Sequence, residues 1–302
     1  MNPKYPVFIP SKGRADSRLT QKALDIIGVP YYVVVEEAEH DEYAAVTDLK
    51  RNKILTLPFS NRGLTASRNW ISDKADEMGV TRHWQLDDNI RDFYRVNHNR
   101  RIRVTDGTMF HAMEMFSDRY ENVAISGPNY LVFAPRRAKF PPFYLNTRVY
   151  SCSLIRNELG YRHELFFNDD TDICLRVLKD GWATVLFNAF LCQKVATMRV
   201  KGGNTGVYQG DGRLQMAQQL ADAHPDVTTV SEKWGRYQHH VNYAPFKYNL
   251  LKLRPEIERT EGFDNMGMIL EKTIEEKWVE INEETEEIKG KERAQPTWKQ
   301  GL

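Results

Sequence analysis

Residues 5–35 read YPVFIPSKGRADSRLTQKALDIIGVPYYVVV, and this stretch decides the fold. Its two apolar runs, residues 5–10 and 31–35, are rich in aromatic and β-branched side chains and predict buried strands. Between them, residues 19–27 carry apolar side chains at helical spacing and end at Gly28, which predicts a helix. A strand, a helix and a second strand in this order favour a parallel sheet.

The same alternation continues as far as residue 223. Further strands are expected at residues 54–57, 83–86, 123–126, 149–155 and 183–192. Further helices are expected at residues 65–77, 108–116, 172–178 and 212–223. The sequence therefore predicts an α/β fold with a mixed, mostly parallel sheet flanked by helices on both faces. Residues 128–146, which are rich in proline and aromatic side chains, are expected to form a long loop.

The composition is that of a globular protein that lies in the cytoplasm. The chain has 302 residues, of which 41% are hydrophobic and 27% charged. No apolar run approaches the roughly 18 residues of a transmembrane helix, and the N-terminus lacks a secretory signal. Three widely spaced cysteines, Cys152, Cys174 and Cys192, predict reduced and mostly buried thiols.

Charge is distributed unevenly along the chain. Residues 255–302 carry 13 acidic and 7 basic side chains, whereas the whole chain has a net charge of +1. The remaining body is therefore basic and suits a polyanionic partner such as DNA or a nucleotide diphosphate, although ordinary solvated charge explains it equally well. We expect one domain over residues 1–245 and an acidic helical extension over residues 246–302, with a charged helix at 268–288.

A first acidic cluster, Asp87, Asp88 and Asn89, follows the strand predicted at residues 83–86. Adjacent carboxylates at a strand end repel each other, and their burial is costly unless a cation is present. A magnesium or manganese ion that holds a substrate diphosphate would remove that cost, because both ions favour oxygen ligands. A polar turn that caps the next element is the structural alternative.

A second acidic cluster, residues 168–172 (NDDTD), precedes an apolar helical pattern. One of its side chains is expected to cap the helix, and a cap needs only one acid. Because neighbouring residues project in different directions, a second aspartate can face a cleft. An ionised carboxylate there can take a proton from an acceptor hydroxyl.

Basic and glycine-bearing turns follow the first and third predicted strands. Ser11, Lys12 and Arg14 follow Pro10, and Gly63 lies between Asn61 and Arg68 near a helix start. Helix N-termini and arginine side chains bind phosphate, and glycine lets the backbone approach a ligand. Glu36 ends the second strand, where a carboxylate can accept hydrogen bonds from a ribose or base. Lys201 lies in a glycine-rich segment that could close over a diphosphate or be an ordinary loop.

Taken together, the segments SKGR, VVVEE, NRGLTASRN, QLDDN and NDDTDICLRVLKDG resemble the GT-A (Rossmann-like) nucleotide-sugar glycosyltransferases over roughly residues 5–195. The resemblance implies that Asp87, Asp88 and Asn89 meet the donor's ribose and a divalent ion. It also implies that Asp170 is the catalytic base, that Asp169 precedes it, and that Asp172 and Arg176 are structural. Asn89 departs from that family's pattern, in which a third acid is common.

A narrower resemblance rests on VFIPSKGRADS, NTRVYSCSLIRN and FFNDDTDICLRVLKDGW. These segments are similar to the TET-associated glycosyltransferases, a group that includes bacteriophage enzymes acting on 5-hydroxymethylpyrimidines in DNA. The resemblance implies a UDP-sugar donor, a double-stranded DNA acceptor carrying 5-hydroxymethylcytosine or 5-hydroxymethyluracil, and a location in the cytoplasm of an infected bacterial host. Neither composition nor periodicity indicates the donor or the acceptor.

Arginines interleaved with aromatic residues offer separate support for DNA. Cations neutralise phosphates and aromatic rings stack on exposed bases. The alternative is that the arginines pair with nearby acids such as Asp92 and Asp106. The side chains expected to contact DNA are Arg95, Arg100, Arg101, Arg136 and Arg137.

Three functions remain open from the sequence. The first is a metal-dependent hexosyl or pentosyl transferase that acts on hydroxymethylated DNA. The second keeps the chemistry but uses a glycan or protein acceptor. The third is an inactive module that binds a nucleotide sugar or DNA, which the two retained acidic clusters disfavour. The transferred sugar and the choice between inversion and retention are not determined by the sequence.

Overall fold

The computed structural model describes residues 1–97, 100–134, 141–195, 212–233 and 235–257, and short stretches at 268–271, 280–281, 288–289 and 297–300. The chain divides into two compact units, Met1–Lys252 and Leu253–Leu302. The large sheet, the α-helices and the candidate site described below all belong to the first unit. The predicted domain boundary after residue 245 stays a prediction.

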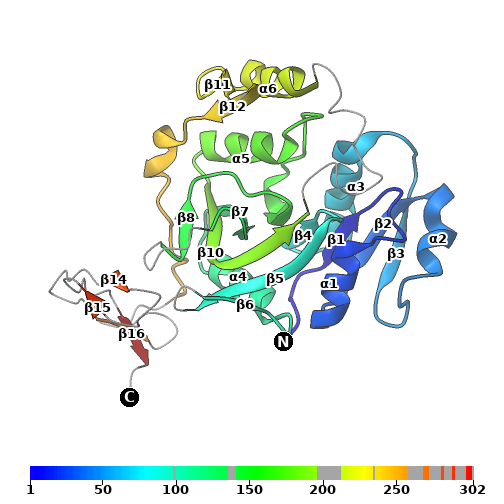
Figure 1. The fold of residues 1–302 in the computed structure, drawn as a ribbon, viewed down its shortest axis with the longest axis horizontal. Coiled ribbons are helices and arrows are strands. Elements are labelled where there is room, and N and C mark those ends of the chain that lie inside the picture. The colour runs from blue at the N-terminus through cyan, green and yellow to red at the C-terminus, as the bar shows by residue number, and fades with distance from the viewer. Residues whose placement is uncertain are drawn as a thin grey trace. The chain divides into compact units, whose positions relative to one another are not determined.

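One mixed sheet of ten described strands forms the centre of the first unit (Figure 1). Its order is β3-β2-β1-β4-β9-β7-β10-β5-β6, and β8 also pairs with β10. Seven strands run in one direction, and β5, β8 and β9 run in the other, which confirms the predicted mixed, mostly parallel sheet. The bounds are β1 Val7–Pro10, β2 Tyr32–Glu36, β3 Lys53–Leu57, β4 Arg82–Leu86, β5 Ile90–Asn97, β6 Arg100–Arg103, β7 Val123–Tyr130, β8 Phe143–Leu145, β9 Cys152–Arg156 and β10 Ala183–Lys194.

Helices cover both faces of this sheet, as the sequence predicts. Helices α1 and α4 pack on one face, and α3 and α5 pack on the other. The helix bounds are α1 Leu19–Ile27, α2 His40–Ala44, α3 Gly63–Glu77, α4 Thr108–Asp118, α5 Asp169–Lys179 and α6 Gly212–Ala223. Short 3-10 turns lie at Glu37–Glu39, Asn157–Leu159 and Ala244–Tyr248.

The alternation of side chains along β1 shows how the sheet is held between its helices. Val7 and Ile9 point into the core beneath α1 and α4, whereas Phe8 points into the core beneath α3. All three side chains are at most 1% exposed. Full burial of a side chain of this size stabilises a fold by about 1.5–3 kcal/mol, so the first strand anchors both layers.

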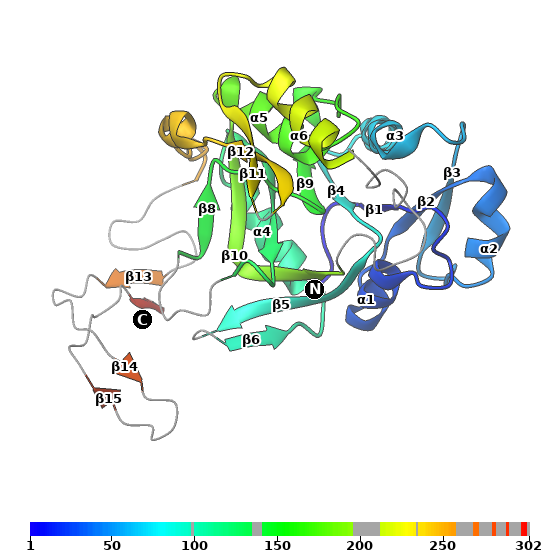
Figure 2. The same cartoon turned by 45° about the horizontal axis from the view of Figure 1, so that its top comes forward.

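An outer layer covers α5 on the side away from the sheet. It consists of α6 and the hairpin of β11 (Thr228–Lys233) and β12 (Arg236–Val241) (Figure 2). Leu175 and Leu178 of α5 pack against Leu220 and Val227 in this layer. The first turn of α5, which carries the second acidic cluster, is thus held between the sheet and the outer layer.

Several elements differ from the sequence-based expectation. The loop expected at residues 128–146 contains the end of β7 and the strand β8, because both pair with β10. The charged helix expected at residues 268–288 is wrong at the residues that the structure describes there. Met268–Glu271 pairs with Thr297–Gln300, and Glu280–Ile281 pairs with Ile288–Lys289, as antiparallel strands. A helix with few apolar positions has no face to bury, so tertiary packing cannot stabilise it.

One further sequence-based expectation is met. Cys152, Cys174 and Cys192 are buried free thiols. Among the described residues, none of the helices has the length and apolar character needed to cross a membrane.

Candidate functional site

A cavity of about 350 Å³ opens at the edge of the sheet where β1, β2, β3, β4 and β10 end. Its volume falls within the range of small-molecule sites, roughly 300–1,000 Å³. Nine of the residues predicted to bind a donor line this cavity, and their role in donor binding stays a prediction. The lining residues are Pro10, Ser11, Lys12, Arg14, Glu36, Leu57, Asn61, Gly63, Leu64, Ser67, Asp87, Asp88, Asn89 and Lys194.

The turn after β1 joins the turn before α3 across the mouth of this cavity. Lys12 Nζ donates to Glu36 Oε1 at 2.7 Å and to Asn61 Oδ1 at 2.6 Å. Burial pushes the pKa of Glu36 up, but the Lys12 ammonium and the Asn61 N–H outweigh burial and hold that pKa below its ordinary value. Glu36 is therefore an ionised acceptor at neutral pH.

Helix α3 begins at the cavity with a glycine whose conformation disfavours other residues. Gly63 has φ +82°, a left-handed conformation that side chains with a Cβ disfavour. A Cβ on Gly63 would also approach the Phe166 ring to 3.1 Å. Because Gly63, Leu64 and Ser67 line the cavity, the positive end of the α3 dipole faces it and favours an anion such as phosphate.

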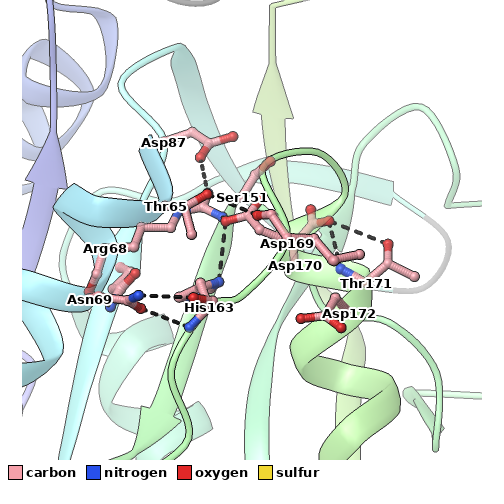
Figure 3. Close-up of polar contacts among 12 residues, drawn as sticks. Thr65, Arg68, Asn69, Asp87, Ser151, His163, Asp169, Asp170, Thr171 and Asp172 are labelled. Carbon is pink, nitrogen blue, oxygen red and sulfur yellow. Dashed lines mark hydrogen bonds and ion pairs between the residues drawn. The ribbon is translucent and has the colours of Figure 1, made fainter. Parts of the chain in front are cut away.

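A single buried arginine connects the two acidic clusters. Arg68, in the second turn of α3, donates to Asp87 Oδ1 at 2.7 Å and to Asp169 Oδ2 at 2.5 Å (Figure 3). Its side chain is only 8% exposed. The sequence predicted that Arg68 binds phosphate, but it does not line the donor cavity and instead joins Asp87 at the end of β4 to Asp169 at the start of α5.

The segment before α5 is fixed against α3 by its own hydrogen bonds. Asn69 donates to the His163 carbonyl at 2.8 Å and accepts from the His163 N–H at 2.7 Å (Figure 3). Thr65 Oγ1 donates to the Leu165 carbonyl at 2.9 Å. These contacts place the second acidic cluster within reach of Arg68 although the two lie far apart in the sequence.

The remaining oxygen of Asp87 is paired with a lysine that the sequence did not single out. Lys194 Nζ, at the end of β10, donates to Asp87 Oδ2 at 2.6 Å and to Ser151 Oγ at 2.9 Å. Burial lowers the pKa of Lys194, but Asp87 outweighs burial and raises that pKa above its ordinary value. Burial likewise raises the pKa of Asp87, and Lys194 and Arg68 together hold it well below its usual range. The strand was predicted to end at residue 192, whereas β10 continues to Lys194 and thereby brings this lysine to the edge of the sheet.

Asp88 faces the turn after β1. It forms an ion pair with Arg14 and accepts from Ser11 Oγ at 2.8 Å. Ser11 Oγ also lies 2.7 Å from the hydroxyl of Tyr43. Burial raises the pKa of Asp88 despite its proximity to Arg14.

The residues predicted to hold a divalent ion are already engaged with protein donors. All four carboxylate oxygens of Asp87 and Asp88 accept hydrogen bonds from Arg68, Lys194, Arg14 or Ser11. Asn89 Nδ2 donates to the Val195 carbonyl at 3.2 Å, and Asn89 Oδ1 is buried without a described partner. Within the described part of the chain, His, Cys, Asp and Glu side chains form no group of three that could hold a metal ion. This arrangement does not fit a divalent ion, and the predicted magnesium or manganese stays a prediction.

The aspartates of the second cluster lie in the first turn of α5, which begins three residues earlier than expected. Asp169 faces Arg68, and its Oδ2 also lies 3.2 Å from His163 Nδ1. Asp170 Oδ1 accepts from the Thr171 N–H at 2.7 Å (Figure 3). The N-cap residue, Asn168, makes no capping hydrogen bond with its side chain, which donates instead to the Met216 carbonyl at 2.8 Å.

The two neighbouring carboxyls have opposite electrostatic character. Burial and the negative charge of Asp169 raise the pKa of Asp170. Burial acts the same way on Asp169, but Arg68 outweighs it and lowers the pKa of Asp169. A carboxyl with a raised pKa is a stronger base, so Asp170 is the better proton acceptor of the pair.

Asp172 is buried between two basic side chains. It pairs with Arg176 at 3.1 Å, and its other oxygen lies 2.9 Å from Nε2 of the buried His224. The pair between Asp172 and His224 fastens α5 to the outer layer.

The arginines predicted to contact DNA lie partly on the β5–β6 hairpin. Arg95 and Arg100 are exposed and have no partner among the described residues. Arg101 donates to the Ala134 carbonyl. Arg103 pairs with Asp92, so this arginine follows the structural alternative, in which arginines pair with nearby acids. Arg136 and Arg137, like the donor residue Lys201, lie outside the described residues.

An aromatic cluster adjoins Asp170 on the side of β7 and β9. The Tyr130 ring lies 4.2 Å from Tyr150 and 5.6 Å from Phe133, and the Arg148 guanidinium lies 4.7 Å from the Tyr150 ring. Phe133 is 56% exposed. The Val149 N–H donates to Cys174 Sγ at 3.3 Å, so the chain beside Tyr150 packs against α5 one turn after Asp170.

A cavity of small-molecule size, lined by acidic and basic side chains at the carboxyl ends of parallel strands, is typical of a ligand-binding α/β protein. The family model described as TET-Associated Glycosyltransferase matches residues 5–203. The chain therefore belongs to the TET-associated glycosyltransferase family, and it is a glycosyltransferase.

The chain was also compared with curated proteins and with solved structures. No curated protein matches the chain. Among solved structures, a protein described as "Crystal Structure of a Mycobacterial Protein" matches with 10% sequence identity and a TM-score of 0.43. The match covers 78% of this chain and 83% of that chain.

Proposed function

We propose that the protein transfers a sugar from a UDP-sugar to the hydroxymethyl group of 5-hydroxymethylcytosine or 5-hydroxymethyluracil in bacteriophage DNA. The observation that carries the proposal is the bridge of Arg68 between Asp87 and Asp169. This bridge ties Asp169, the neighbour of the proposed base Asp170, to Asp87, which lines the cavity that suits a nucleotide diphosphate. Membership of the TET-associated family supports DNA modification as the context.

The residues supply a sequence of bond changes that balances. The Asp170 carboxylate accepts the proton of the acceptor hydroxyl, and that oxygen forms a bond to the anomeric carbon of the sugar. The bond from the anomeric carbon to the diphosphate breaks, and the diphosphate leaves with the electron pair. A single displacement of this kind inverts the anomeric centre.

The aromatic cluster and the arginines support a DNA acceptor. A hydroxymethyl group inside a duplex is hard to reach, and enzymes that act on such bases extrude them from the stack. Phe133, which is 56% exposed, offers a ring face for the extruded base, and Tyr130 packs against both Phe133 and the buried Tyr150. The exposed Arg95 and Arg100 provide cations for backbone phosphates.

Mass spectrometry of nucleosides tests this function. Duplexes that contain 5-hydroxymethylcytosine, 5-hydroxymethyluracil or only unmodified bases are incubated with the protein and a panel of UDP-sugars. We expect a mass increase of one hexose or pentose on a hydroxymethylated nucleoside and none on unmodified DNA. If sugar appears only on a glycan or protein acceptor, or on no acceptor while the donor binds, the DNA function is wrong.

A further inference from the structure

The charged groups around the donor cavity are balanced without any added ion. Asp87 accepts from Arg68 and Lys194, and Asp88 accepts from Arg14 and Ser11. The third acid of the cavity, Glu36, pairs with Lys12 at 2.7 Å. Each carboxylate that could attract a divalent ion is thus neutralised by an arginine or lysine of the protein itself.

A divalent ion on Asp87 would meet the charge of Lys194 at short range. Magnesium–oxygen bonds are about 2.1 Å long. Lys194 Nζ lies 2.6 Å from Asp87 Oδ2, so an ion bound to that oxygen would lie at most about 4.7 Å from the ammonium. Two like charges this close in a half-buried site repel strongly. The ion could bind only if Lys194 moved away.

Lys194 is well placed to do the work of such an ion. It lines the donor cavity, and its side chain is 21% exposed. An ammonium group has three hydrogens, of which two have acceptors in Asp87 and Ser151 among the described residues. The third can donate to a phosphate oxygen. Asn89 adds no charge that would favour a metal, because its side chain is a neutral amide.

We propose that Lys194, in place of a divalent metal ion, neutralises the diphosphate of the donor, and that sugar transfer by this enzyme is independent of metal. The inference rests on the proposed function, because it takes a nucleotide sugar as the donor. When the bond to the anomeric carbon breaks, the electron pair stays on the leaving phosphate oxygen. The ammonium stabilises that negative charge through a hydrogen bond, and no proton needs to be transferred to the leaving group.

Calorimetric titration of the full-length protein with UDP provides the test, first in EDTA and then in manganese chloride. We expect the wild-type protein to bind UDP in EDTA with an affinity within about twofold of that in manganese. Lys194→Gln should weaken binding in EDTA by about tenfold or more, since it removes a charged donor. Lys194→Arg keeps the charge and should restore most of the affinity.

Two features make the result specific to this site. Lys179→Gln serves as a matched control, because Lys179 pairs with Asp226 at 2.7 Å on the surface of α5, and its UDP affinity should not change. Lys194→Gln also frees Asp87 Oδ2, so manganese should strengthen UDP binding by this variant more than by the wild type. Melting curves confirm that each variant is folded.

Wild-type protein that binds UDP only with manganese overturns the inference, as does a Lys194→Gln variant that binds UDP as well as the wild type does. Absence of UDP binding under both conditions also overturns it. A transfer assay separates this failure from that of the proposed function. Transfer that requires manganese supports the proposed function and contradicts the inference. Metal-free UDP binding without transfer to any DNA supports the inference and contradicts the proposed function.

Discussion

At the scale of single residues, the site depends on neighbouring carboxyls that differ in their partners. Arg68 binds Asp169 and lowers its pKa, whereas among the described residues the Asp170 carboxyl accepts hydrogen bonds only from Thr171, and its pKa is raised. Adjacent positions at a helix start point in different directions, so one acid can serve the framework while the next faces the substrate. This division of roles supports the proposal that Asp170 is the base.

Asp170→Asn tests that assignment. The amide keeps the shape but cannot accept a proton, so we expect the transfer rate to fall by about 10²–10⁴-fold while UDP affinity stays within about twofold. In the wild type, transfer should be lost as the pH falls through the raised pKa of Asp170, because the base becomes protonated. Single-turnover rates measured from pH 4 to pH 8 give both results. Asp226→Asn, on the exposed surface, should transfer normally, and equal loss of UDP binding and transfer in Asp170→Asn would refute the base role.

Arg68→Met tests the bridge between the two acidic clusters. Removing the guanidinium leaves Asp87 and Asp169 without their shared partner in a buried position, and loss of one member of a buried pair costs about 3–5 kcal/mol. Urea unfolding measures the change in the free energy of unfolding. Arg162→Met is the control, since Arg162 pairs with Asp73 and Asp76 at the surface, where an ion pair contributes about 1 kcal/mol or less. Equal losses in the two variants would show that the bridge has no special weight.

Residue types and spacing predicted most residues of the donor cavity, but they did not predict which acidic and basic side chains pair with each other. Ser11, Lys12, Glu36 and Asn61 were expected because polar residues after parallel strands gather at one edge. Lys194 was missed because its strand was ended too early in the sequence. The role of Arg68 could not be read from the sequence, because a basic residue near a helix start suits a phosphate as well as a carboxylate.

At the scale of elements, buried strands and amphipathic helices were predicted well because their apolar spacing is unambiguous. Helix α1 has the predicted bounds, and its Gly28 has the left-handed conformation of a helix end. The β5–β6 hairpin was not predicted, because its strands are rich in arginine and show no apolar alternation. Its strand β5 forms by pairing with β10, and such pairing is a property of the folded sheet.

Gly127→Ala tests how closely β7 and β9 pack. A Cβ at Gly127 would lie 2.1 Å from the Cys152 carbonyl oxygen and 2.8 Å from Val149 Cγ1, so the backbone would have to shift. Such overpacking costs about 1–3 kcal/mol or more. Thermal melting should show a larger loss for this variant than for Gly160→Ala, where a Cβ meets no atom within 4 Å and only the left-handed φ of +67° opposes it. A smaller drop in melting temperature for Gly127→Ala than for Gly160→Ala would contradict the close packing of β7 against β9.

At the scale of the whole molecule, the motifs that line the donor cavity are far apart along the chain but meet at one edge of the sheet, because each lies at or after the end of a parallel strand. The α/β alternation predicted the layers and the edge at which ligands bind. It could not predict the outer layer of α6, β11 and β12, since the contacts of Leu220 and Val227 with α5 join segments about forty residues apart or more. Long-range contacts of this kind leave no periodic pattern in the sequence.

The stability of the whole fold should depend on pH through His83, which is buried in the sheet. Burial lowers the pKa of His83 to about 4, from an ordinary value of 6.5. Its neutral ring donates from Nδ1 to Asn157 and accepts at Nε2 from Gln85, and protonation would break the second bond. Because the folded pKa is depressed, this stability is present above about pH 6.5 and is lost as the pH falls toward 4, by about 3 kcal/mol.

Urea unfolding between pH 7.5 and pH 4.5 measures this dependence. His83→Gln cannot be protonated and should lose less stability than the wild type over this range. His40→Gln, at an exposed position on α2, should follow the wild type. Parallel curves for all three proteins would show that another group controls the acid sensitivity.

Among the described non-glycine residues, five have a left-handed backbone, and three of them, Asn61, Ser151 and Asn168, belong to the site or its immediate support. A side chain with a Cβ makes this conformation less stable than glycine would by about 1–2 kcal/mol. Laboratory evolution for heat resistance alone should therefore favour glycine at these three positions. Ser151→Gly and Asn61→Gly would each remove an acceptor from a lysine of the donor cavity, so the most heat-resistant descendants of this enzyme should also be among its slowest.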